Sequence, residues 1–208
     1  MKEFNAFIES LKARVNNNLP GLPAQLKMAP VSRAKMMEQI DTQNARKAAV
    51  LILFYPDNGV RTVFIERQDY DGIHSGQISF PGGQFEEPDT SLQDTAVRET
   101  FEEIGVRSKE VNIIGNLTEL YIPPSNFMVY PVLGYTAKVP DFSPDPQEVK
   151  KIISVYLGEL TMAQTRQERF IETSYQDKIK VPCYMIDGHM IWGATAMMVS
   201  ELIELVNS

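Results

Sequence analysis

The sequence predicts one α/β domain in which β-strands are layered with helices. Strand-like apolar segments are interspersed with amphipathic helical segments along the chain, which favours this class over an all-helical or all-strand fold. With 208 residues and 43% apolar content, the chain is long enough to bury one sizeable core. No repeats or low-complexity tracts interrupt it.

The N-terminal part predicts a helical extension. Residues 4–19 carry apolar side chains at helical spacing and end in Asn- and Pro-containing sequence. Residues 20–45 are mixed, because Pro20, Pro23 and Pro30 interrupt any regular element. We therefore expect residues 1–45 to pack as an extension on a main domain of residues 46–208.

The main domain predicts mostly strands. Ala48–Tyr55 is a continuous apolar run of the length of a buried strand, and Asp187-Gly188 is a strong hairpin signal. Residues 68–79 and 141–146 predict loops. Strands are expected at 48–55, 61–66, 111–121, 127–138, 152–156, 178–186 and 189–192, and further helices at 157–166 and 194–206.

One predicted helix breaks the ordinary rules of helix stability. Its apolar arc holds Ala96, Val97, Thr100, Phe101 and Ile104, and its opposite arc holds Arg98, Glu99, Glu102 and Glu103. Glu99 and Glu103 repel one another at i,i+4, and the last turn of a helix disfavours anions. A solvated acidic face is one interpretation. The other is that three carboxylates converge as hard oxygen ligands for Mg²⁺ or Mn²⁺.

The segment before this helix favours the metal interpretation. In Phe80-Pro81-Gly82-Gly83, the two glycines permit close backbone approach to a ligand or a metal. Asp89 or Thr90 is the expected N-cap of the helix, and Gly105 is its expected C-terminal stop.

These residues together resemble the Nudix box, the signature of hydrolases acting on nucleoside-diphosphate-linked substrates. Three departures are present: the gap from Gly83 to Arg98 is one residue longer than in the general box, Thr90 replaces an early glutamate, and Thr100 takes a usually aliphatic position. The resemblance implies a Nudix-type α/β/α sandwich with a mixed β-sheet. It is carried by Phe80, Pro81, Gly82, Gly83, Arg98, Glu99, Glu102, Glu103 and Gly105.

The surrounding sequence resembles one subfamily, the coenzyme A pyrophosphatases. Arg67, His74 and Gly76 precede the glycine pair as in the extra motif of that subfamily. The resemblance spans roughly residues 46–205. Further matching stretches are 131–132, 144–149 and 191–196.

The resemblance implies roles for individual residues. Glu99 and Glu103 would be direct ligands of Mg²⁺ or Mn²⁺, with Glu102 close behind and the Gly82 carbonyl as a further ligand. Arg98 would orient these carboxylates through ion pairs rather than bind substrate.

The substrate would be held by Arg67 as a phosphate clamp, together with His74 and Gly83. A surface arginine at a strand end is the alternative for Arg67. The general base stays open, because Nudix enzymes use either a glutamate of the box or a carboxylate from a later loop. Glu148 is the later-loop candidate.

The implied reaction is metal-dependent hydrolysis of the diphosphate of coenzyme A or its derivatives, giving 3′,5′-ADP and 4′-phosphopantetheine. ADP-ribose, NADH or another nucleoside diphosphate derivative remains an alternative, because the box binds the diphosphate and not the attached groups. A non-catalytic Nudix ligand sensor is a further alternative. A calcium-binding protein is disfavoured, because the glutamates lack the spacing of a calcium loop.

Charge and composition limit the partners. A formal net charge of −7 argues against a general nucleic-acid binder, so we expect a small-molecule nucleotide substrate met by local positive charge. The single Cys183 allows no internal disulfide and suits a reducing compartment. Since no signal peptide or apolar run of membrane-spanning length is evident, we expect a cytoplasmic protein without membrane contact.

Overall fold

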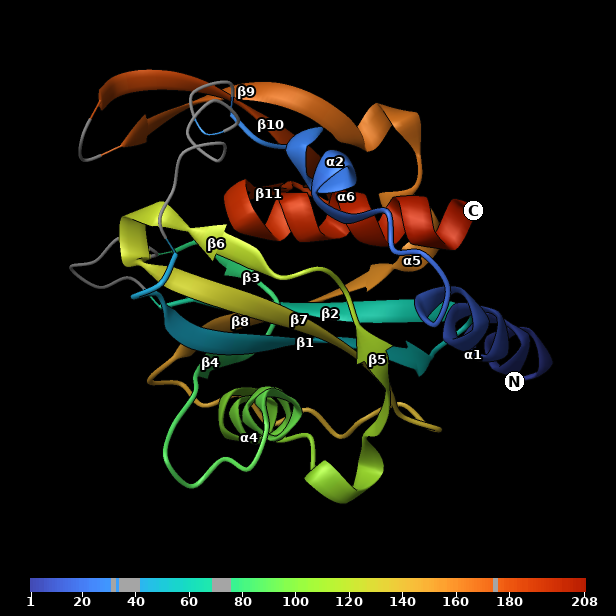
Figure 1. The fold of residues 1–208 in the computed structure, drawn as a ribbon. Coiled ribbons are helices and arrows are strands. Elements are labelled where there is room, and N and C mark those ends of the chain that lie inside the picture. The colour runs from blue at the N-terminus through green and yellow to red at the C-terminus, as the bar shows by residue number, and fades with distance from the viewer. Residues whose placement is uncertain (31–32, 34–41, 69–75, 174–175) are drawn as a thin grey trace.

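The molecule is built of layers around a mixed central sheet (Figure 1). Helix α4 (Leu92–Ile104) covers one face of the sheet, and α6 (Gly193–Asn207) with α2 (Gly21–Leu26) covers the other. A second, three-stranded sheet lies beyond α6. The computed structural model describes residues 1–30, 33, 42–68, 76–173 and 176–208.

The central sheet has eight strands and confirms the predicted α/β class. Strand β1 runs parallel to β7, and the other pairings among its described strands are antiparallel. Along its main path lie β3 (Ile78–Ser79), β2 (Val60–Arg67), β1 (Arg46–Pro56), β7 (Phe127–Tyr135) and β5 (Asn112–Asn116). Off this path, β4 (Gly82–Gln84) pairs with β1, β6 (Leu120–Ile122) with β7, and β8 (Val149–Tyr156) with β2.

The smaller sheet consists of β9 (Arg166–Thr173), β10 (Gln176–Ile186) and β11 (His189–Trp192). Asp187-Gly188 forms the predicted hairpin turn, with φ of 49° and 79°. The helix expected at 157–166 is wrong in extent: α5 spans only Leu157–Leu160, a 3₁₀ turn follows, and the chain then enters β9.

Two other regions also differ from the prediction. The strand expected at 111–121 is divided into β5 and β6, and β5 begins only after a 3₁₀ turn at Ser108–Glu110. Helix α2 forms within the segment expected to be irregular. Helix α1 (Lys2–Val15) confirms the helix predicted at residues 4–19 but ends earlier, at Val15, and it buries Phe4, Ile8 and Leu11.

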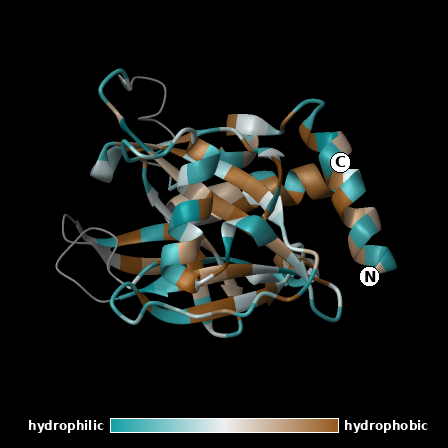
Figure 2. Ribbon diagram, turned by 90° about the horizontal axis from the view of Figure 1, so that it is seen from below, coloured by the Kyte–Doolittle hydropathy of each residue, from teal (hydrophilic) through white to brown (hydrophobic). Residues whose placement is uncertain are grey.

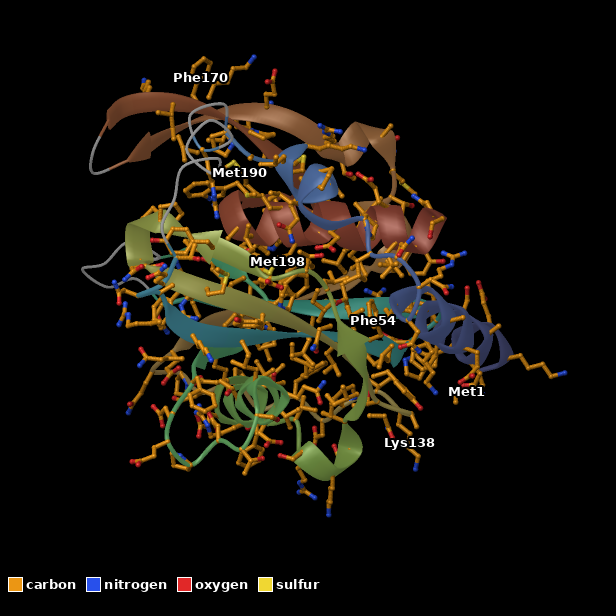
Figure 3. All side chains as sticks on the ribbon, in the orientation of Figure 1. Met1, Phe54, Lys138, Phe170, Met190 and Met198 are labelled. Carbon is orange, nitrogen blue, oxygen red and sulfur yellow. The ribbon has the colours of Figure 1, made fainter. Side chains whose placement is uncertain are left out.

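The apolar core consists of two clusters, one on each face of the central sheet. The strands of this sheet are accordingly mostly hydrophobic, and the loops around it are mostly polar (Figure 2). Phe54 and Met198 belong to the core cluster between the sheet and α6, whereas Phe170 lies on the outer side of the second sheet and is 69% exposed (Figure 3). Among the described residues, no helix is long and apolar enough to cross a membrane.

A buried carboxylate connects the N-terminal segment to α6. Glu201 of α6 is inaccessible to solvent, and its two oxygens accept hydrogen bonds from the Gly21 and Thr118 backbone amides, the Thr118 hydroxyl and the Gln25 side-chain amide. These donors lie 2.7–3.2 Å from the carboxylate. Because each oxygen has partners, the burial of this charge is compensated.

Candidate active site

The glycine pair lies in the segment formed by β3 and β4, which follows β2 in the chain and pairs in the sheet with both β1 and β2. Gly82 pairs with Val50 and Gly83 with Ala49, while the chain just before them pairs with β2 through β3. Gly82 has φ of 151°, and a Cβ there would lie 2.3 Å from the Ala49 carbonyl oxygen. Glycine is therefore required at position 82 by the backbone alone.

Helix α4 is placed against this turn by caps at both ends. Its N-cap is Ser91, whose hydroxyl accepts a hydrogen bond from the Asp94 amide at 3.1 Å, and not Asp89 or Thr90 as the sequence had suggested. The helix ends as predicted at Gly105, which has φ of 76° and donates its N–H to the Phe101 carbonyl.

Glu103 points into the protein, which corrects the helical-wheel interpretation. Its side chain is 1% exposed, whereas Phe101, assigned to the buried arc, is 51% exposed. One Glu103 oxygen accepts the Gly82 amide at 2.8 Å, and the other accepts the Arg67 guanidinium at 3.2 Å. Glu103 thereby connects α4 to the glycine turn and to the end of β2.

The surroundings of Glu103 oppose its negative charge. Burial raises the pKa of Glu103 to about 8, and the nearby charges of Glu99 and Glu148 act in the same direction. The Arg67 guanidinium and the Gly82 N–H act against this rise. A site in which burial and two neighbouring carboxylates raise the pKa of a third carboxyl group is suited to gain a cation.

Glu99 lies directly over the second glycine. A Cβ at Gly83 would lie 2.4 Å from the Glu99 carboxyl carbon, so the missing side chain leaves space for this carboxylate. Burial raises the pKa of Glu99, while Arg98 opposes the shift. The two glycines thus serve different purposes: Gly82 fits the sheet, and Gly83 makes room for an acidic group.

Arg98 is the centre of an ion-pair network. Its guanidinium donates two hydrogen bonds to Asp89, at 2.9 and 3.0 Å, and others to Glu99 at 3.0 Å and Glu102 at 2.9 Å. It also reaches the Gln84 carbonyl at 3.1 Å. These contacts confirm the prediction that Arg98 pairs with the carboxylates of its own helix.

Asp89 is the site residue that the sequence analysis placed wrongly. It is buried, and besides Arg98 it accepts hydrogen bonds from the Glu86 amide and the Thr95 hydroxyl. The hydrogen bonds from Arg98 hold the pKa of Asp89 well below its usual range. The available signal was an acidic residue close before a helix that carries an arginine on its polar side.

The remaining candidate residues lie around the same turn or outside the described part of the chain. Glu102 has a side chain 51% exposed and contacts Arg98. Glu148 is exposed in the turn before β8, where its carbonyl accepts the Gln68 amide at 3.0 Å. Its charge raises the pKa of both Glu99 and Glu103. His74 falls outside the described residues.

The donor set fits a divalent cation that keeps other ligands. Within the described part of the chain, no three acidic, histidine or cysteine side chains already surround one point that could hold a metal ion. Carboxylates instead border the glycine turn on one side. This arrangement suits Mg²⁺ or Mn²⁺, which takes most of its ligands from water and substrate phosphates rather than from a closed protein cage.

Two solved structures illustrate the similarity of fold. The Nudix hydrolase RenU from M. smegmatis superposes with a TM-score of 0.55 at 15% identity, covering 78% of this chain and 86% of that one. The MutT protein from Methanosarcina mazei Go1 gives a TM-score of 0.51 at 16% identity, covering 78% and 95%. These likenesses show a shared fold.

Sequence relatives carry Nudix names. The Nudix hydrolase NudL of Pectobacterium atrosepticum is 32% identical over 160 residues, which are 76% of this chain and 81% of the relative. The human mitochondrial coenzyme A diphosphatase NUDT8 is 27% identical over 197 residues, which are 93% and 77% of the two chains. A family model described as the NUDIX domain matches residues 45–174. This chain therefore belongs to the Nudix family and is a hydrolase of phosphorus-containing anhydrides.

Proposed function

We propose that this enzyme uses divalent metal ions to hydrolyse the diphosphate of coenzyme A or its derivatives. The products would be 3′,5′-ADP and 4′-phosphopantetheine. The observation that carries the metal-dependent part is the position of Glu99 and Glu103 over the glycine turn, with Arg67 beside them. The coenzyme A part is supported by the upstream motif and by the likeness to the human relative named for that activity.

The metal ligands would come from α4 and the turn. Glu99 and Glu103 would bind Mg²⁺ or Mn²⁺ directly, and the Gly82 carbonyl would add a backbone oxygen. Glu102 is held by Arg98 at 2.9 Å and would join as a more exposed ligand. The bound ions would neutralise the diphosphate and lower the pKa of a coordinated water molecule.

The substrate would be oriented by residues bordering the same turn. Arg67 ends β2 and has a side chain 28% exposed, so its guanidinium can contact both Glu103 and an incoming phosphate. Gly83 leaves the backbone open to close approach. His74, which is outside the described residues, stays our further candidate for substrate binding. Since two charge-assisted contacts of Arg67 would be lost together, Arg67→Ala should raise KM for the substrate more than Arg67→Lys does.

Glu148 is our candidate for the general base. Residue Glu148 is exposed, and its charge acts on both Glu99 and Glu103, so it is near enough to act at the same site. In this role it would accept the proton of the attacking water. Glu148→Gln should lower kcat and leave Mn²⁺ binding unchanged, whereas a loss of Mn²⁺ binding would make Glu148 a ligand instead.

A substrate panel tests the proposal. Coenzyme A, NADH, ADP-ribose and deoxynucleoside triphosphates would be incubated with the enzyme and Mg²⁺ or Mn²⁺, and the products identified by mass. Coenzyme A should be cleaved fastest, giving the two products named above. Equal or faster hydrolysis of ADP-ribose or NADH would contradict the coenzyme A assignment.

Matched variants connect this activity to the site. Glu103→Gln should abolish hydrolysis of every substrate while the protein stays folded. Glu110→Gln, which changes an exposed glutamate outside the site, should leave hydrolysis unchanged. Full activity of Glu103→Gln would remove Glu103 from the metal site.

A further inference from the structure

A buried hydroxyl near the site has no hydrogen-bond partner among the described residues. Within that part of the chain, the Oγ of Ser79 is inaccessible to solvent and unpaired, and the same is true of the Oγ1 of Thr62. Leaving a buried hydroxyl unpaired costs free energy, so most such groups in folded proteins have a partner. Each of these two hydroxyls therefore calls for an explanation, and their positions in the sheet differ.

Ser79 lies on the face of the sheet that carries the site. In the antiparallel pairing of β3 with β2, Ser79 stands opposite Ile65, so the two side chains share a face. Ile65 packs in the core cluster that contains Ala96 and Ile104 of α4. Arg67 follows Ile65 by two residues and lies on this same face.

The Glu103 carboxylate is held above this position. Its two oxygens contact the amide of Gly82, three residues after Ser79, and the guanidinium of Arg67, one diagonal step from Ser79 across the strand pair. Ser79 is therefore a neighbour of both groups that hold Glu103, of Gly82 along the chain and of Arg67 across the strand pair. Among the described residues on this face of β2 and β3, Ser79 has a buried hydroxyl that makes no hydrogen bond.

Thr62 lies on the opposite face. It precedes Val63, which packs in the α4 cluster, and it pairs with Phe54, which packs in the cluster on the α6 side. Since side chains alternate along a strand, the Thr62 hydroxyl faces α6 and cannot reach Glu103. Thr62 is therefore a matched control: it is also an unpaired buried hydroxyl, and it lies one strand away from Ser79.

We infer that Ser79 is a positioning residue for Glu103, donating a hydrogen bond to its carboxylate when this group turns toward a bound divalent ion. An ionised carboxylate can accept about four hydrogen bonds, and Glu103 receives two in the structure, one from Gly82 and one from Arg67. A ligand that turns to a metal needs an outer partner to fix its orientation. This inference rests on the proposed metal-dependent function.

The test measures metal binding without substrate. Mn²⁺ binding to the full-length protein would be followed by electron paramagnetic resonance, for the wild type, Ser79→Ala, Ser79→Thr and Thr62→Val. We expect Ser79→Ala to bind Mn²⁺ about tenfold more weakly, the loss typical of an outer-shell partner. Ser79→Thr keeps the hydroxyl and should bind within about twofold of the wild type. Thr62→Val should bind as the wild type does.

Thermal melting of the metal-free proteins separates positioning from a structural role. Because the Ser79 hydroxyl makes no hydrogen bond in this state, Ser79→Ala should melt no lower than the wild type. In turnover, Ser79→Ala should need about tenfold more Mn²⁺ for half-maximal activity, with the KM for substrate unchanged.

Two results would overturn the inference in distinguishable ways. If the wild type binds Mn²⁺ and hydrolyses its substrate but Ser79→Ala does so equally well, then Ser79 does not position Glu103 and the proposed function stands. If the wild type binds no Mn²⁺ and hydrolyses none of the panel, both the proposed function and this inference are wrong.

Discussion

Replacing Gly83 by alanine tests the site most directly, because the atoms nearest to the added methyl group all belong to the Glu99 carboxylate. The new Cβ would lie 2.4 Å from the Glu99 carboxyl carbon, whereas ordinary van der Waals contact begins at 3.4 Å. The carboxylate must therefore move by about 1 Å. A displacement of that size in a catalytic group can reduce the rate by about 10²-fold, which corresponds to about 2.7 kcal/mol.

The fold should tolerate this change. The group that must move is the end of a flexible side chain, and the backbone at Gly83 is not in the left-handed region. Gly82→Ala is the matched contrast, because its Cβ would meet the Ala49 carbonyl and the Val50 Cα at 2.3 and 2.5 Å. That variant should lose stability, by about 1–3 kcal/mol from its backbone conformation alone.

The assay compares kcat/KM and urea unfolding for the two variants and the wild type. Gly83→Ala should unfold at a urea concentration near that of the wild type and lose about two orders of magnitude in kcat/KM. A fully active Gly83→Ala enzyme would refute the placement of Glu99 over the glycine turn. So would a Gly83→Ala protein that loses as much stability as Gly82→Ala.

Three further outcomes follow from the site. In metal-free protein, the unfolding free energy should fall as pH rises from about 4.5 to about 8, because folded Glu103 keeps a proton that the unfolded chain releases. Urea titrations should show that this fall is at most ~1.4 kcal/mol per pH unit and that Glu103→Gln removes it. The same fall in Glu103→Gln would contradict the effect of burial on Glu103. Asp89→Asn should cost about 2 kcal/mol in urea unfolding and lower activity, because the hydrogen bonds donated by Arg98 lose their charged acceptor. Wild-type stability and activity would show that the pair is dispensable. Chelation with EDTA should stop hydrolysis and added Mg²⁺ or Mn²⁺ should restore it, and turnover that persists in EDTA would exclude metal dependence.

The sequence predicted the elements whose signals are local. The α4 stop at Gly105 and the hairpin at Asp187-Gly188 depend on residues that permit positive φ, and the structure has both. Strand β1 is recognisable because it is apolar on both faces, which fits its position in the middle of the sheet.

Features that depend on tertiary packing were not predictable. Helical periodicity places Glu103 among polar residues, but the β3–β4 segment brings the Gly82 amide to it and the end of β2 brings the Arg67 guanidinium, and the glutamate is buried there. Phe101 is exposed although it is apolar, because the covered side of α4 carries Ala96, Ile104 and the buried Glu103. Strand β9 is rich in charge because it belongs to the small outer sheet, so it lacks an apolar signal.

The Glu201 carboxylate has a consequence for attempts to shorten this chain. The segment matching the family model, residues 45–174, includes neither the helix that carries Glu201 nor the Gly21 and Gln25 donors. Removing only the N-terminal segment would leave the Glu201 carboxylate buried with half of its hydrogen bonds lost. We therefore expect a stable shortened protein to need α2 and α6 in addition to the segment that matches the family model.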